Sequence, residues 1–126
     1  MTENVAPEVP CARIHEGDVL EPVQIPVTRE TLVRYAGAST DFNPIHWSDR
    51  AARAAGMDGV IAHGMWTMGA ALGVVVHWVA DPGRIVSQRA RFVRPVLVPD
   101  TDEGTQVIVS GQVTKADDQT ATLSLD

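Results

Sequence analysis

Residues 60–80 contain no Asp, Glu, Lys or Arg, and no other feature of the chain constrains the fold as much. Inside this run, residues 64–79 repeat apolar side chains at helical spacing, and the remaining faces are apolar as well. The spacing therefore predicts a helix over 64–79. A helix that is apolar all round needs cover on every side.

A membrane span and a buried central helix both account for such a segment. The segment carries polar side chains at His63, Thr67 and His77, and it has no flanking positive charge. It is also joined to amphipathic segments that need an aqueous fold. These features favour a helix wrapped by a sheet over a membrane span.

Gly69 and Gly73 lie four residues apart within this helix. Each costs about 1 kcal/mol of helix propensity relative to alanine. We therefore expect another backbone to approach the helix closely at these two positions.

Strand patterns flank the helix on both sides. Residues 23–27 alternate apolar and polar, and the prolines at 22 and 26 demand an edge or bulged strand. Thr28 can cap a following helix, which we expect to end at Gly37. Residues 84–93 alternate like a strand with one wet side, and residues 107–113 and 121–125 predict a hairpin. The pattern predicts an α+β fold in which an antiparallel sheet wraps one long helix.

The chemistry is concentrated in the stretch Asp41-Phe42-Asn43-Pro44-Ile45-His46. Pro44 fixes its own φ and drives Asn43 to an extended conformation, so this stretch cannot be one continuous helix. A bent backbone can bring Asp41 and His46 together. A carboxylate and an imidazole that face each other can hold a water or a substrate hydroxyl and act on it as base and acid.

The whole string resembles the signature of the MaoC-like (R)-specific enoyl hydratases and dehydratases, and the matching residues are Tyr35, Gly37, Ser39, Asp41, Asn43, Pro44, Ile45, His46 and Ala52. Thr40 departs from the signature, which usually has glycine just before the aspartate. The resemblance begins near His15 and includes residues 62–65. The NPIHW, IAHGM and DPG segments also resemble the catalytic B subunit of mycobacterial (3R)-hydroxyacyl carrier-protein dehydratase.

The resemblance implies a hot dog fold and the reversible hydration of trans-2-enoyl thioesters to (3R)-hydroxyacyl thioesters. Asp41 and His46 would move the protons. Asn43 and Pro44 would orient or support them, although a purely structural turn role for Asn43 is an equal alternative. The backbone amides of Gly64 and Met65, at the start of the long helix, would form an oxyanion hole.

The same chemistry requires no cofactor and no metal. A metal site that combines Asp41, His46 and His63 is the alternative, but the sequence has no recognised ligand spacing. We therefore interpret His63 as a helix-start or packing residue.

The chain of 126 residues fits one domain. We expect a disordered tail over 1–12 and a single MaoC-like hot dog domain over 13–126, with or without the last strand of that fold. A formal charge of -6 argues against nucleic-acid binding. The single cysteine, Cys11, and an N-terminus without signal-peptide features predict a cytoplasmic protein.

The expected substrates are thioesters of coenzyme A or of an acyl carrier protein. Arg89, Arg91 and Arg94 fall close together, either as a solvated strand face or as a contact for substrate phosphates. We expect a dimer, formed either with a second copy or with a different hot dog subunit, because a small sheet around one helix leaves an edge and an apolar flank.

Two other functions are compatible with this fold. A hot dog thioesterase would bind the same acyl substrate but hydrolyse the thioester. A noncatalytic acyl-binding partner subunit would not need both proton-transfer residues, and this chain has Asp41 and His46.

Overall fold

The computed structural model describes residues 13–126, so the tail expected over 1–12 lies outside the described residues. The elements follow in the order β1 (Val19–Val27), α1 (Arg29–Ser39), the 3₁₀ turn η1 (Pro44–His46), α2 (Asp49–Ala54), α3 (Gly64–Val79), the 3₁₀ turn η2 (Pro82–Arg84), β2 (Thr105–Ala116) and β3 (Ala121–Leu125). The predicted central helix therefore has its expected bounds, and the predicted first strand and C-terminal hairpin are also present.

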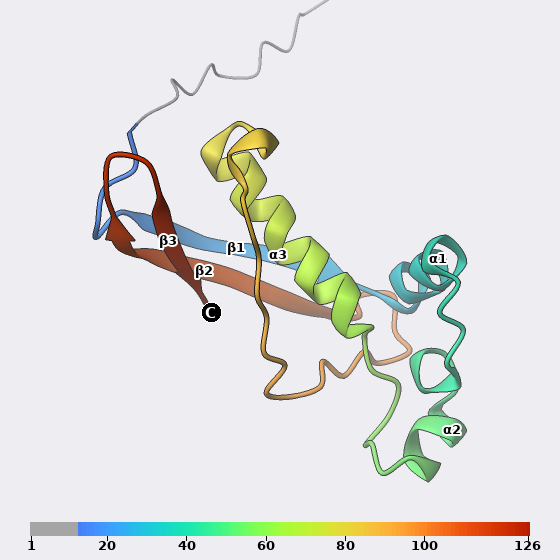
Figure 1. Ribbon diagram of the computed structural model, residues 1–126. Coiled ribbons are helices and arrows are strands. Elements are labelled where there is room, and N and C mark those ends of the chain that lie inside the picture. The colour runs from blue at the N-terminus through green and yellow to red at the C-terminus, as the bar shows by residue number, and fades with distance from the viewer. Residues whose placement is uncertain (1–12) are drawn as a thin grey trace, which may run out of the picture.

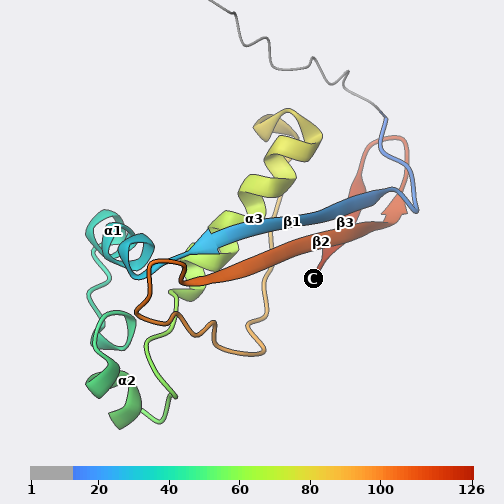
Figure 2. The ribbon, with the colours of Figure 1, turned by 180° about the vertical axis from the view of Figure 1, so that it is seen from behind.

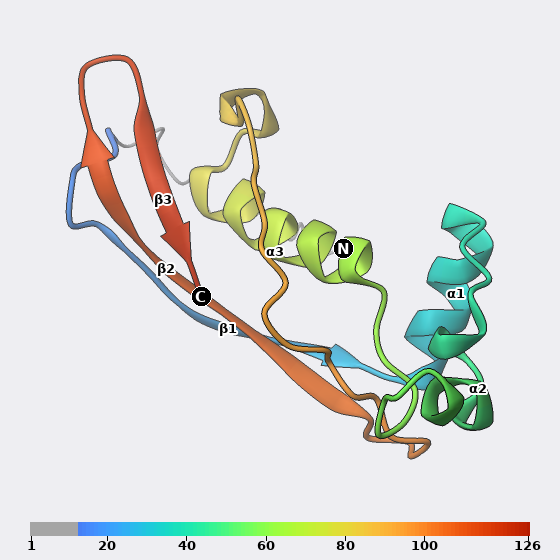
Figure 3. The same ribbon diagram turned by 60° about the horizontal axis from the view of Figure 1, so that its bottom comes forward.

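The three strands form one antiparallel sheet in the order β1-β2-β3. Figure 1 shows α3 lying across this sheet, with α1 and α2 together near the first turn of α3. Figure 2 shows the opposite side, where β1 and β2 run as a long pair. In Figure 3 the strands curve past one side of α3. The predicted α+β arrangement of a sheet around a long helix is confirmed.

Two apolar clusters hold these layers together. One joins the end of β1 to α1 and to the loops on either side of α3, and it contains Val27, Leu32, Val60, Ala62 and Val98. The other joins β1 to the C-terminal half of α3 through Leu20, Val75 and Val79. Each such buried side chain contributes on the order of 1.5–3 kcal/mol relative to an exposed one. The first cluster packs beside the Asp41–His46 stretch and fixes the loops around it.

The prolines of β1 lie where their missing N–H groups are tolerated. The register between β1 and β2 shifts between Leu20 and Val23, so Pro22 falls within a bulge. Among the described strands β1 is at the edge of the sheet, so Pro26 leaves no interior ladder incomplete. The expectation of an edge or bulged strand is confirmed.

The strand predicted over 84–93 is absent. The chain from η2 runs back along α3 without a strand (Figures 1 and 3), and Gln88 is tied to α3 through the Met68 carbonyl at 3.1 Å. An alternating pattern becomes a strand only where a neighbouring backbone supplies hydrogen bonds, and the described residues supply no such neighbour for this segment. Val86 is 90% exposed, so the predicted division into one wet and one buried side is wrong.

The prediction about Gly69 and Gly73 is also wrong for the described chain. Both glycines are exposed, and a Cβ placed on either would meet nothing within 4 Å. The sheet covers only one side of α3, which buries Val75 and Val79 but leaves Met65 62% exposed. No helix among residues 13–126 is long and apolar enough to cross a membrane.

The first helix continues past its expected end. We expected Gly37 to stop it, but α1 runs to Ser39 and ends at Thr40, which adopts the left-handed conformation with φ 61°. Glycine occupies that region freely, whereas a β-branched side chain is strained there. The departure from the family signature at Thr40 therefore falls at the position where glycine is favoured on conformational grounds.

We expect Thr40→Gly to stabilise the fold by up to about 1 kcal/mol. Relief of the left-handed strain contributes about 1–2 kcal/mol, and the larger backbone entropy of glycine in the unfolded chain offsets part of it. Urea denaturation measures the difference, with Thr40→Ala as a control that keeps a Cβ at positive φ and gains less. A Thr40→Gly variant less stable than the native chain would contradict this account.

Candidate active site

The turn that carries Asp41 and His46 is built from short-range hydrogen bonds. The Asn43 amide donates to the Asp41 carboxylate at 3.2 Å, and the Ile45 amide donates to the Asn43 side chain at 3.2 Å. Pro44 is the first residue of η1, where its fixed φ suits the turn and no N–H is required. Asn43 therefore caps the turn and orients the carboxylate through its backbone, and Pro44 shapes the bend.

The bend brings the two expected proton-transfer groups together. His46 Nε2 lies 4.0 Å from Asp41 Oδ2; the His46 side chain is buried and the Asp41 side chain is half exposed. His46 Nδ1 lies 2.7 Å from the carbonyl oxygen of Ile61. Because a carbonyl only accepts, Nδ1 must donate the hydrogen, and the neutral ring then has its lone pair on Nε2. Two acceptors thus face one another across a gap that a donating water can bridge.

The carbonyl that orients His46 belongs to a firmly held loop. Asp49 accepts from the Val60 amide at 3.1 Å, and its two carboxylate oxygens accept from Arg29 Nη2 at 2.9 and 3.0 Å. Arg29 also donates to the Val98 carbonyl at 2.6 Å. The Val60 amide and the Arg29 guanidinium hold the pKa of Asp49 below its ordinary value. This network links α1, α2 and the loop beside His46, and sequence reasoning missed it because its members are far apart in the chain.

His63 lies against the same site. Its side chain is only 1% exposed, its ring stacks on His46 with centroids 3.8 Å apart, and the Tyr35 ring meets it edge-on at 4.8 Å. His63 does stand at the start of α3, as expected, but its side chain makes no capping hydrogen bond. It instead places Nε2 3.2 Å from the Asp41 carbonyl oxygen.

Asp41, His46 and His63 also form the candidate metal set among residues 13–126, with one ligand atom from each lying within 4.8 Å of the others. A metal ion binds an imidazole nitrogen in the plane of its ring. The two rings are stacked 3.8 Å apart with 24° between their planes, so an ion bound in the plane of one ring lies well out of the plane of the other. The arrangement suits proton transfer better than coordination of a single ion.

The first turn of α3 lies next to this cluster because Gly64 follows His63 directly. A Cβ placed on Gly64 would stand 3.2 Å from the tip of the Phe92 ring, so the absence of a side chain allows this contact. The Met65 side chain is exposed, so the expected oxyanion-hole role concerns only the Met65 backbone amide. Sequence reasoning also missed Phe92, since no motif links it to a residue so distant in the chain.

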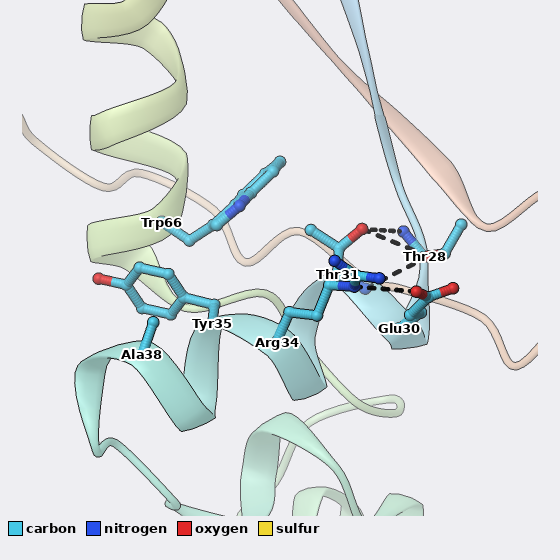
Figure 4. A pocket seen from close by; sticks show the side chains of 7 residues that line it. All are labelled: Thr28, Glu30, Thr31, Arg34, Tyr35, Ala38 and Trp66. Carbon is cyan, nitrogen blue, oxygen red and sulfur yellow. Dashed lines mark hydrogen bonds and ion pairs between the residues drawn. The ribbon is translucent and has the colours of Figure 1, made fainter.

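A hollow of 520 Å³ opens beside α1, lined by Thr28, Glu30, Thr31, Arg34, Tyr35, Ala38 and Trp66 (Figure 4). Trp66 reaches over it from α3, while the Glu30–Arg34 ion pair lies at its edge. A second hollow of 480 Å³ adjoins the Arg29–Asp49 pair. Neither of these two hollows has Asp41 or His46 in its lining, and the Asp41 side chain is half exposed in the single chain.

Known proteins resemble this chain in sequence. The family model described as "MaoC like domain" matches residues 11–125. The chain is 40% identical over 75 residues to 3-hydroxyacyl-thioester dehydratase X of Mycobacterium tuberculosis, a match that covers 60% of this chain and 26% of that protein.

Solved structures give the same result for the fold. A MaoC-like dehydratase superimposes with a TM-score of 0.82 at 35% identity, over 90% of this chain and 36% of that one. The ChsH1-ChsH2 complex from Mycobacterium tuberculosis includes a chain that matches with a TM-score of 0.74 at 23% identity, over 87% of this chain and 83% of that one. The expected fold is therefore confirmed. The chain spans only about a quarter to a third of the first relatives it matches.

Proposed function

Because this chain belongs to the MaoC-like domain family, we propose that it catalyses the reversible hydration of trans-2-enoyl thioesters to (3R)-hydroxyacyl thioesters in fatty-acid metabolism. The observation that carries the proposal is the 4.0 Å gap between His46 Nε2 and Asp41 Oδ2. Both atoms accept hydrogen bonds when Asp41 is ionised and His46 is neutral, so a water bound between them has its oxygen lone pairs free for attack.

In the forward reaction the water oxygen bonds to C3 of the enoyl group as the pair removes one of its protons. The electrons of the C2–C3 double bond move toward the thioester carbonyl and form an enolate. C2 then takes a proton from the pair, so that one water has been added in total. Dehydration passes through the same groups in reverse, and the order in which Asp41 and His46 act remains open.

The thioester oxygen gains negative charge in the enolate, and the amides at the start of α3 are placed to stabilise it. The first backbone N–H groups of a helix have no partner within the helix and carry partial positive charge. We assign this role to the amides of Gly64 and Met65, because Gly64 directly follows the His63 that contacts the pair. Preorganised donors of this kind commonly supply a large part of the rate enhancement.

Gly64→Ala is expected to lower kcat/KM by about 10- to 100-fold, because its methyl group occupies the space through which the thioester approaches the backbone. Part of the effect could come from the Phe92 ring, 3.2 Å from that methyl position. The double variant Gly64→Ala/Phe92→Leu relieves that crowding and should remain slow. The matched control is Gly69→Ala on the exposed side of α3, where a Cβ meets nothing and activity should be unchanged. Full activity in Gly64→Ala would show that these amides do not stabilise the enolate.

The decisive experiment follows the absorbance of the conjugated enoyl thioester with crotonyl-coenzyme A. Loss of absorbance without release of free thiol indicates hydration, whereas thiol release indicates the alternative thioesterase. If neither signal appears with crotonyl-coenzyme A, with a longer acyl chain or with a carrier-bound substrate, the chain acts instead as a noncatalytic acyl-binding subunit.

The substrate's carrier group is proposed to contact Arg89, Arg91 and Arg94. All three are exposed, and none forms an ion pair within residues 13–126. Guanidinium groups bind phosphates well, and both coenzyme A and a phosphopantetheine arm carry them. We propose that this arginine surface decides whether the protein accepts a thioester of coenzyme A or of an acyl carrier protein.

We expect the active protein to be a dimer. Large exposed apolar side chains follow Asp41, follow His46 and lie in the first turn of α3: Phe42 is 62% exposed, Trp47 55% and Met65 62%. A second hot dog subunit, identical or different, would cover them and exclude water from the site. Light scattering of the purified chain, alone and with candidate partners, measures the assembly. A stable monomer with full hydratase activity would contradict the expectation.

A further inference from the structure

His63 is buried and titratable, and the proposed reaction assigns it no proton to move. Its ring contacts both members of the proposed pair, through the stack on His46 and through Nε2 near the Asp41 carbonyl. Because that carbonyl only accepts, Nε2 must carry the hydrogen. His63 Nδ1 is then a bare acceptor, and it is buried without a hydrogen-bond partner among residues 13–126.

An unpaired buried acceptor costs free energy, so a residue chosen only for packing would not be a histidine. A phenyl ring, although somewhat larger, would also stack on His46 and would have no orphaned nitrogen. A histidine at the start of a helix also forgoes the side-chain cap that Ser, Thr, Asp or Asn would make. The reason for a histidine at this position must therefore lie in its hydrogen bond to the Asp41 carbonyl and its stack on His46.

We infer that His63 is the positioning residue of the site: its N–H tethers the Asp41 backbone, and its stacked ring fixes the plane of His46. The inference rests on the proposed function for its catalytic meaning.

The surroundings of His63 favour the neutral form. Burial lowers the pKa of His63, and the nearby His46 acts in the same direction, while the hydrogen bond to the Asp41 carbonyl opposes them. Asp41, His46 and Tyr35 are the titratable groups that face it. The neutral form is the one that donates from Nε2 to the Asp41 carbonyl and leaves Nδ1 as the unpaired acceptor.

Two substitutions separate the tether from the stack. His63→Phe keeps a flat ring against His46 but removes the N–H that reaches the Asp41 carbonyl. His63→Gln removes the ring and keeps an amide donor. The control is His77→Gln, which removes an exposed histidine from the same helix. Thermal unfolding of each variant establishes that the comparison is made between folded proteins.

The first readout is the NMR spectrum of the His46 ring protons, which needs no substrate. We expect His63→Gln to change the His46 ring chemical shifts, since the stacked ring no longer lies 3.8 Å from it. His63→Phe should keep a ring-current shift on His46, and His77→Gln should leave the native spectrum of His46. Unchanged His46 ring shifts in His63→Gln would overturn the role of the stack.

The second readout is turnover of crotonyl-coenzyme A. Both His63 variants should lose about 10-fold or more in kcat with little change in KM, because a misplaced pair slows chemistry more than binding. Native kcat in both variants would overturn the positioning role. If the native protein is inactive on enoyl thioesters, the proposed function fails, while the NMR spectrum still decides whether His63 holds the His46 ring.

Discussion

Asp41→Asn is expected to lower hydratase turnover by about 10²- to 10⁴-fold, with the fold intact. The substitution keeps the size of the side chain but replaces the acceptor that faces His46 Nε2 at 4.0 Å. An amide cannot take a proton from water, so only His46 is left to exchange protons with a water bound in the gap. The Asp41 side chain is half exposed, so the change should have little effect on stability.

His46→Ala should cause a loss of the same order, about 10²- to 10⁴-fold, by removing the other acceptor. This variant also empties a buried position beside His63, so its unfolding must be measured alongside its activity. Asp102→Asn and His77→Ala, at exposed positions, are the matched controls. Native rates in both Asp41→Asn and His46→Ala would exclude the proposed mechanism.

Gly104→Ala is expected to cause a large loss of stability. Gly104 has φ 60°, and an added Cβ would stand 2.0 Å from the Val27 carbonyl oxygen and 2.9 Å from Thr28 Cα. These are backbone atoms and cannot move aside like the end of a side chain. The positive φ contributes about 1–2 kcal/mol and the overlap adds about 1–3 kcal/mol, a large part of the 5–15 kcal/mol typical of a domain.

Gly17→Ala separates the two contributions. Gly17 also has a positive φ, of 91°, but a Cβ there meets nothing within 4 Å. Gly17→Ala should therefore lose only the stability that the positive φ costs. Chemical denaturation of both variants measures the difference between their free energies of unfolding. Gly104 directly precedes β2 and lies against Val27, at the end of β1, and Thr28, the cap of α1. Its substitution should therefore also weaken the proposed hydratase activity. Equal stabilities of the two variants would show that the overlap relaxes without cost.

Local sequence predicted the elements whose formation depends on their own residues. The apolar run predicted α3 with its observed bounds, and Thr28 caps α1 as expected. The Asp41-to-His46 string predicted a bend that brings the two side chains together, and the structure places them 4.0 Å apart. Their catalytic role remains a prediction.

Long-range contacts decided the elements that the sequence misjudged. Residues 84–93 have the alternation of a strand but no strand partner in the described chain, so they run along α3 instead. Gly69 and Gly73 lie on the side of α3 that the sheet leaves uncovered. A pattern of residues specifies which secondary structure a segment can form. Whether that structure forms depends on a segment from elsewhere in the chain that supplies hydrogen bonds or a packing surface.

The sequence by itself determined the family, the central helix and the pair of groups proposed to move protons, because each depends on residue types at short spacing. Only the tertiary structure placed His63 against both Asp41 and His46, Phe92 against Gly64, and Arg29 against Asp49. These pairs join separate segments of the chain. Their contacts arise from how α1, α3 and the loop after α3 pack together, which no local spacing encodes.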